Sequence, residues 1–257
     1  TGADGTTSMY VRGGNAGNNM FTLDGVPVYG YSHILGLTTI IPNDVIDDVS
    51  LSKGGFDGSE NNFPAAHMRI VTKDTVSRYR SSFAVNNFLA SAYTEGPVGK
   101  KLSYVLSARV SPLTYEYRAV RKFLPQMLGG LDNFNAKVGD LYGKLHFQVN
   151  EKSALDASFL GSVDSYGYDT QGDSRDEMSW DNLLGILRYR YDGEVTSFNL
   201  TASANRYGSR QKQDKTYRGE VSHFSLRSSL MEYGLKAGLQ HRFLDDRLVI
   251  GEGLNLR

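Results

Sequence analysis

The stretch that decides the fold is Lys101-Leu102-Ser103-Tyr104-Val105-Leu106-Ser107-Ala108-Arg109-Val110. Its even-numbered residues are apolar or aromatic, and its odd-numbered residues are polar except for one valine. A period of two is typical of a β-strand with one face in an apolar medium and the other against water or polar groups. The same alternation recurs over 197–205 and over much of the chain from about residue 81 onward. The sequence therefore predicts a mainly β protein.

The connections between these strands alternate in length. Strands are predicted at about 81–94, 101–112, 137–149, 154–164, 181–191, 195–207, 222–243 and 247–257. Short turns rich in Gly, Asn, Asp or Pro are predicted at 95–100, 150–153, 192–194 and 244–247, and long polar loops at 113–136, 165–180 and 208–221. A membrane barrel has tight turns on one rim and loops on the other. We therefore predict about eight antiparallel transmembrane β-strands belonging to an incomplete large outer-membrane β-barrel.

The two faces of the predicted strands support this interpretation. Aromatic residues lie beside the short turns in the apolar phase, as in the girdle where a barrel meets the membrane interface; they are Tyr93, Phe147, Tyr189, Tyr191 and Phe243. The opposite phase is polar, as expected for the lumen of a wide barrel; its residues include Tyr142, Lys144, His146, Gln148, Asp156, Ser158 and Ser162. A soluble β-sandwich would explain the alternation but not the unequal connections.

Composition limits the remaining classes of function. Lys plus Arg and Asp plus Glu number 28 each, so no net field favours nucleic acid. No run approaches the roughly 18 apolar residues of a membrane-spanning helix, and cysteine is absent. The chain begins at Thr1 without an initiator Met or signal region, and it ends within an alternating run. We expect it to be a piece of a longer protein.

The segment before the barrel carries four ordered blocks. They are Tyr10-Val11-Arg12-Gly13-Gly14, then Leu23-Asp24-Gly25-Val26-Pro27-Val28, then Val49-Ser50-Leu51-Ser52-Lys53-Gly54-Gly55-Phe56, and finally Ile70-Val71-Thr72-Lys73-Asp74. This order resembles the C-terminal half of the plug domain of TonB-dependent outer-membrane receptors, notably of the Bacteroidetes type. The resemblance covers 9–74 by motif, and it departs from the family over 57–64. It implies that 1–76 is the C-terminal part of a plug domain and 77–257 the N-terminal part of the transmembrane barrel.

The resemblance also implies a function. Such a receptor captures a scarce nutrient, of the siderophore, glycan, peptide or cobalamin class, and imports it to the periplasm of a Gram-negative cell. Its partners are TonB, engaged through an N-terminal segment that this chain lacks, the outer-membrane lipid, the ligand and, as a further candidate, a surface lipoprotein. The alternative is an outer-membrane adhesin or structural barrel that binds without transport. A soluble carbohydrate-binding β module ranks third.

Most motif residues are expected to be structural. Gly13-Gly14 and Gly54-Gly55 permit crowded or left-handed backbone, and Asp24-Gly25 predicts a tight turn ahead of Pro27. Arg12 would need a carboxylate partner in a polar lumen. Lys53 belongs to the same structural motif. A phosphate loop at Val11–Gly17 is disfavoured, because the Gly-Lys-Ser/Thr ending is missing.

Ligand-binding candidates lie in two places. Tyr29, Tyr31 and His33 follow the second block, where the resemblance implies plug loops that face the outside. Tyr166, Tyr168 and Arg210 lie in the predicted long loops. Neither metal-ligand spacing nor a catalytic arrangement is present, so no metal, cofactor or enzymatic activity is expected. Acidic residues within 165–180 are interpreted as a solvated loop rather than a calcium site.

Overall fold

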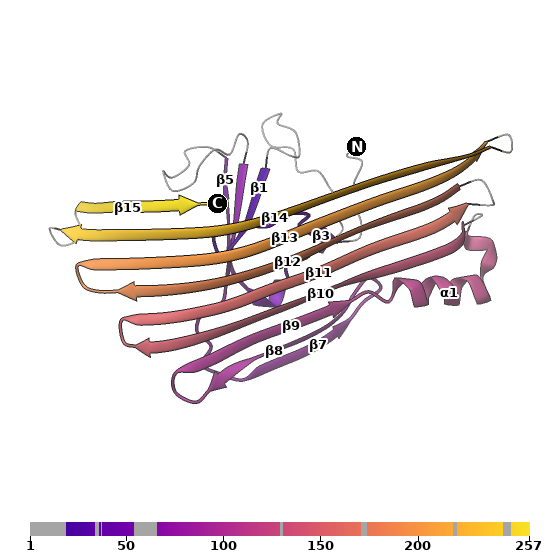
Figure 1. Ribbon diagram of the computed structural model, residues 1–257. Helices are drawn as coiled ribbons and strands as arrows, with labels where there is room; N and C mark the ends of the chain where they lie inside the picture. The colour runs from indigo at the N-terminus through magenta and orange to yellow at the C-terminus, as the bar shows by residue number, and fades with distance from the viewer. Residues whose placement is uncertain are drawn as a thin grey trace.

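The computed structural model describes residues 19–33, 36, 38–53, 66–128, 131–170, 174–217, 220–243 and 248–257. Within these residues two β-sheets dominate, and one α-helix accompanies them (Figure 1). The larger sheet has nine antiparallel strands in the order β15-β14-β13-β12-β11-β10-β9-β8-β7. The strands β7 and β15 each have one neighbour among the described strands, so the sheet is open.

The strands of the large sheet differ greatly in length. Three short ones are β7 (Arg80–Val85), β8 (Ala90–Val98) and β9 (Leu102–Val110), and another is β15 (Leu248–Leu256). Five long ones are β10 (Leu131–Asn150), β11 (Ser153–Thr170), β12 (Ser174–Asp192), β13 (Thr196–Tyr217) and β14 (Glu220–Phe243). At about 3.3 Å per residue, the 22 residues of β13 extend for about 70 Å. That is about twice what a membrane-spanning strand needs.

The prediction of about eight strands was wrong by one. The stretch 81–94 forms two strands, because the Asn86 side chain accepts hydrogen bonds of 2.9 Å from the backbone N–H groups of Phe88 and Leu89. An asparagine that bonds to the backbone in this way closes a turn. The Asn86-Asn87 interruption in the alternation is therefore a strand boundary.

The predicted long loops were also wrong in kind. The residues of 165–170, 174–180, 208–217 and 220–221 continue the strands, with unbroken pairing between β11 and β12 and between β13 and β14. The part of a strand that extends beyond an apolar medium can carry polar residues on both faces. Its sequence then shows no alternation, so the strand is not recognised. Among the described residues of the predicted loops, only 113–128 lies outside the sheet, and it contains the helix α1 (Leu113–Phe123) and the short 3-10 helix η4 (Pro125–Leu128). The start of α1 contacts the part of β10 that pairs with β11 but not with β9, because Thr114 bonds the backbone of Ala136 there.

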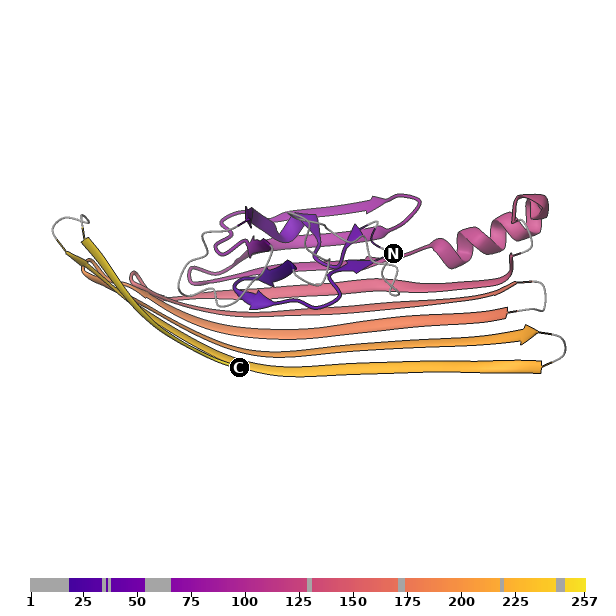
Figure 2. The same cartoon turned by 90° about the horizontal axis from the view of Figure 1, so that it is seen from above.

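The described residues between 19 and 76, which we call the small-sheet region, pack against one face of the large sheet, and we call this its inner face (Figure 2). Its sheet has the order β2-β1-β6-β5, formed by β1 (Asn19–Leu23), β2 (Val26–Pro27), β5 (Ile46–Ser52) and β6 (Ala66–Thr72). Two-residue strands β3 (Ser32–His33) and β4 (Thr38–Thr39) pair beside it, and the 3-10 helix η3 (Asn43–Val45) precedes β5.

One apolar core joins the two sheets. Leu23, Ile40 and Ile41 of the small-sheet region are almost fully buried together with Tyr142 and Leu160 of the nine-stranded sheet, which we call the wall. The polar inward phase predicted for the wall is confirmed, since Lys144, His146, Asp156 and Ser162 are each at most 5% exposed. Tyr93 is an exception to the predicted girdle. It is 3% exposed and faces inward, because its hydroxyl bonds Glu95 and Lys73.

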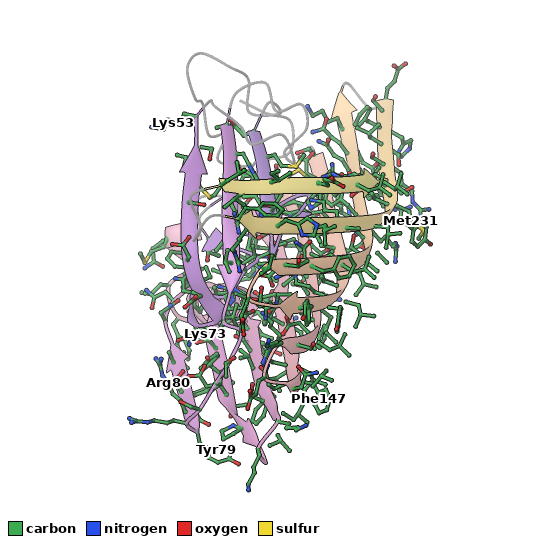
Figure 3. All side chains as sticks on the ribbon, turned by 90° about the vertical axis from the view of Figure 1, so that its left-hand side faces the viewer. Lys53, Lys73, Tyr79, Arg80, Phe147 and Met231 are labelled. Atoms are coloured by element: carbon green, nitrogen blue, oxygen red, sulfur yellow. The ribbon has the colours of Figure 1, made fainter. Side chains whose placement is uncertain are left out.

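The opposite, outer face of the wall carries an apolar band. Strand register places Leu141, Leu183 and Met231 near one margin of the band, and Phe147 and Tyr189 nearer the short turns. Phe147 and Met231 both point away from the small-sheet region in Figure 3. The eight residue steps from Leu183 to Tyr191 cover about 27 Å along the strand. This is comparable with the ~25 Å apolar band of an outer-membrane barrel.

Candidate functional site

Side chains of the wall donate hydrogen bonds to backbone carbonyls in and next to the predicted Asp24-Gly25 turn. Both residues have positive φ, 49° and 81°, in the two-residue loop between β1 and β2, so the predicted turn is confirmed. Three consecutive wall strands supply donors to it: Arg188 bonds the Asp24 carbonyl, Asn205 the Pro27 carbonyl at 2.7 Å, and Lys236 the Gly25 carbonyl at 2.5 Å.

The Asp24 carboxylate ties the same turn to β6. It accepts hydrogen bonds from the Thr72 backbone N–H at 2.9 Å and from the Thr72 hydroxyl at 2.6 Å. Tyr142 of the wall donates to the same hydroxyl at 2.9 Å. This buried chain explains why an aspartate precedes the glycine, because Asp24 fixes both the turn and the neighbouring strand.

Ion pairs join the small-sheet region to the wall at several points, one of them between Lys73 and Glu95 at 3.1 Å. One group of pairs is centred on Asp74, and we call it the Asp74 junction. Asp74 lies 2.6 Å from Lys144 Nζ and 2.5 Å from Arg190 Nη1. Arg190 also bonds Asp156, which in turn pairs with His146 at 2.6 Å. Burial raises the pKa of the Asp74 carboxyl, but Lys144 and Arg190 outweigh burial and hold it below its usual range. Here the wall supplies the cations and the small-sheet region the anion.

The second junction, the His33 junction, lies nearer the extended ends of the long strands. The His33 imidazole is fully buried between two wall carboxylates, with Nε2 3.0 Å from Asp140 and Nδ1 2.5 Å from Asp164. Arg109 donates to the Asp140 carboxylate and, at 2.6 Å, to the Thr39 carbonyl. Burial alone lowers the His33 pKa, but the hydrogen bonds and charges of Asp140 and Asp164 outweigh burial and raise it overall. Here the small-sheet region supplies an imidazole that is a cation when protonated, and the wall supplies two carboxylates together with Arg109.

Aromatic residues cluster at one end of the small-sheet region, in the segment from Tyr29 to His33, which we call the apex. Tyr31 stacks on Phe21 with ring centroids 3.5 Å apart, and burial raises its pKa. Tyr29 donates a 2.9 Å hydrogen bond to Glu232 of β14, and its ring lies 6.4 Å from that of Tyr207. Burial and the Glu232 contact raise the Tyr29 pKa to about 12, so this hydroxyl remains a donor at neutral pH.

The aromatic layer continues onto the inner face of the extended strands. Trp180 donates to the Ser32 carbonyl at 3.3 Å, and its ring lies 5.5 Å from that of Tyr166. Tyr166 bonds Asp164, which connects this layer with the His33 junction. Strand alternation places Tyr168 on the same face. The structure therefore brings together five of the six predicted ligand-binding residues, Tyr29, Tyr31, His33, Tyr166 and Tyr168, along one inner surface.

Arg210 lies on the other side of the wall. Asn205 is buried on the inner face, and Arg210, five residues later on β13, is exposed on the outer face. It borders a recess of about 330 Å³ together with Arg175, Glu177 and Lys212. Of the predicted motif residues, Lys53 is exposed directly after β5. Arg12, Gly13, Gly14, Gly54 and Gly55 lie outside the described residues.

The sequence analysis did not identify the wall partners Asp140, Asp164 and Arg109. A signal for them exists, because a charged residue in the inward phase of a strand needs a partner. Within the described part of the chain no group of three or more His, Cys, Asp or Glu residues could hold a metal ion. No helix there is long and apolar enough to cross a membrane.

Two solved structures share this arrangement of sheets. The siderophore receptor PirA from Acinetobacter baumannii matches over 92% of this chain with a TM-score of 0.55 and 14% identity. BauA, the ferric preacinetobactin receptor from the same organism, matches over 98% with a TM-score of 0.55 and 11% identity. The fold is that of siderophore receptors.

The likeness is one of fold and of part of the chain length. The chain spans 40% of PirA and 52% of BauA. No family model matches the sequence, and no curated protein matches it either.

Proposed function

We propose that this chain is part of a TonB-dependent outer-membrane transporter that takes up a scarce nutrient. The observation that carries the proposal is the two-sided wall, with an apolar outer band and a polar inner face that holds the small-sheet region. A polar lumen with an apolar exterior is the design of an outer-membrane barrel. A folded unit held in the lumen by reversible ionic contacts blocks free passage, so uptake requires it to move.

In this proposal the small-sheet region is the C-terminal part of the plug, and the nine strands are the first part of the barrel. The ligand approaches from the extended ends of β10 to β14 and meets the partly exposed Tyr29, Tyr31 and Tyr168. Tyr166 and Trp180 are only 7% and 8% exposed, so they stabilise this surface from within. Aromatic faces with a few fixed polar groups suit a ligand that carries rings and hydrogen-bonding oxygens. Because PirA and BauA are siderophore receptors, a ferric siderophore is the first ligand class to test.

The proposed mechanism contains no catalytic step. Ligand binding at the apex acts on the segment from Tyr29 to His33, which contacts both the ligand surface and the His33 junction. Force transmitted by TonB then disrupts the junctions on the inner face. The Bacteroidetes origin, a surface lipoprotein partner and the glycan, peptide and cobalamin classes remain predictions.

The test is uptake by cells that produce the full-length protein. We expect uptake of at least one labelled ferric siderophore under iron limitation, and its loss when TonB is deleted from the host. Replacement of the apex tyrosines, Tyr29→Phe with Tyr31→Ala, should weaken binding without removing the protein from the outer membrane. Surface adhesion without TonB-dependent uptake of any nutrient would contradict transport and favour the adhesin alternative.

A further inference from the structure

A row of cations crosses the outer face of the wall beyond the apolar band. Strand register aligns Lys137 of β10, Ser165 of β11, Ser179 of β12, Arg210 of β13 and Arg227 of β14 side by side. All three basic residues are exposed. Four residue steps separate Ser179 from Leu183 at the margin of the apolar band, about 13 Å along the strand. In a membrane this distance corresponds to the headgroup level just outside the hydrocarbon.

Within the described residues no salt bridge neutralises Arg210, Arg227, Lys137 or Lys212. Arg210 and Arg227 are direct cross-strand partners, and like charges in that position are unfavourable. Carboxylates lie close by on the same face, since Glu177 is the cross-strand partner of Lys212 and Asp181 lies two residues from Ser179. These carboxylates pair with other cations: Glu177 lies 2.7 Å and Asp169 3.9 Å from Arg175, and Asp181 lies 3.7 Å from Arg206. Such an arrangement is stabilised when an external anion joins it.

The surface is also hollowed at this level. The recess of about 330 Å³ lies beside Gly167, which has no side chain to fill it, and Arg210 and Lys212 border it. Arginine binds phosphate through two parallel hydrogen bonds, and lysine adds a point charge. The apolar band, whose margin lies about 13 Å nearer the short turns, offers a surface for acyl chains. Headgroup and chains of one molecule can therefore be bound at the same time.

We propose that Lys137, Arg210, Lys212 and Arg227 form a binding site for an anionic lipid of the outer leaflet, held through its phosphorylated headgroup. This inference rests on the proposed location of the wall in the outer membrane. It removes Arg210 from the nutrient-binding site, because the inner and outer faces of a strand are accessible to different ligands. It also gives the wall a fixed depth in the bilayer, set by cations at one margin of the apolar band.

The test compares lipid retention by the full-length protein, purified from outer membranes in detergent, with that of two variants. R210Q/R227Q removes two cations from the row, and K100Q/K152Q removes two from the short turns at the opposite rim. Native mass spectrometry measures bound lipid after addition of a lipid with a phosphorylated sugar headgroup or of its dephosphorylated form. One basic residue near an anionic surface contributes about fivefold in affinity, so we expect about a 25-fold loss for R210Q/R227Q and none for K100Q/K152Q.

A second measurement guards against a folding defect. Because Arg210 and Arg227 repel each other, R210Q/R227Q should raise the unfolding temperature in lipid-free detergent, and the gain should disappear when the phosphorylated lipid is added. Equal retention of both lipids, or equal retention by both variants, overturns the lipid site while leaving transport untouched. Displacement of the lipid by millimolar inorganic phosphate would show a simple anion site and also overturn it. Absence of the full-length protein from the outer membrane would overturn this inference together with the proposed function.

Discussion

The Asp74 and His33 junctions, which both join the small-sheet region to the wall, have opposite polarity. At the His33 junction a buried imidazole from the small-sheet region lies between wall carboxylates, whereas at the Asp74 junction a half-open carboxylate from that region lies between wall cations. His33 has no exposed side-chain surface, and Asp74 has 31%. The wall therefore holds the small-sheet region at two positions along its strands, through contacts whose stabilities respond to pH in opposite directions.

Removal of His33 should have the largest effect. His33→Ala leaves Asp140 and Asp164 buried with Arg109 as the remaining cation, and an uncompensated buried charge costs about 3–5 kcal/mol. We expect the small-sheet region to lose that much stability against release, measured by hydrogen exchange over residues 20–33 in the full-length protein. His33→Gln should cost less, because its amide keeps one hydrogen bond. Equal protection in the wild type and in His33→Ala would contradict the importance of this junction.

The Asp74 junction should respond more weakly. Asp74→Asn removes the charge that faces Lys144 and Arg190, and the buried Lys144 then keeps Thr72 as its hydrogen-bond partner. Because this carboxylate is partly solvated, we expect about 1–3 kcal/mol. The matched control is Asp44→Asn, whose exposed pair with Arg80 at 3.9 Å should contribute at most about 0.5 kcal/mol. Indistinguishable stabilities for the two variants would show that burial at Asp74 is unimportant.

A substitution in the Asp24-Gly25 turn, which is hydrogen-bonded to the wall, should have the smallest effect. Gly25 has φ of 81°, and open space surrounds the position of a Cβ atom, so Gly25→Ala introduces backbone strain without a clash. The expected cost is about 1 kcal/mol. The hydrogen bonds from Lys236 and Arg188 to this turn should survive. A loss several times larger would mean that the turn rearranges and that the wall contacts depend on its exact shape.

Much of the wall could be predicted from the sequence, because a strand between lipid and a polar lumen must alternate. The strands near Leu102–Val110 and the inward Lys144, His146 and Asp156 follow from that rule. The extended halves of β11 to β14 could not be predicted, since a strand with solvent on both faces loses its alternation. Tyr93 was assigned to the outer face because its ring suits a membrane interface. It lies on the inner face instead, where its hydroxyl donates a hydrogen bond to Glu95.

Only the part of the candidate site that belongs to the small-sheet region could be predicted from the sequence. His33 and Tyr29 stood out because ring side chains follow a motif block, but a single sequence does not pair them with Asp164 or Glu232, 131 and 203 residues away. The split between Arg210 and Tyr168 had the same cause. Residues in two predicted loops, 165–180 and 208–221, were treated as sharing one ligand-facing surface, and strand pairing places them on opposite faces of the wall.

The pH dependence of small-sheet release tests the comparison of the two junctions most directly. The pKa of His33 is raised from 6.5, so its stabilisation is complete below that pH and is lost as pH rises through the folded-state pKa. The pKa of Asp74 is lowered from 3.8, so its stabilisation is complete above that pH and is lost as pH falls through the folded-state pKa. Hydrogen exchange over residues 20–33, corrected for intrinsic rates, should show maximal protection between these limits. His33→Gln should abolish only the loss at high pH, and Asp74→Asn only the loss at low pH. Protection that is flat across this range, or a high-pH loss that persists in His33→Gln, would contradict two junctions of opposite polarity.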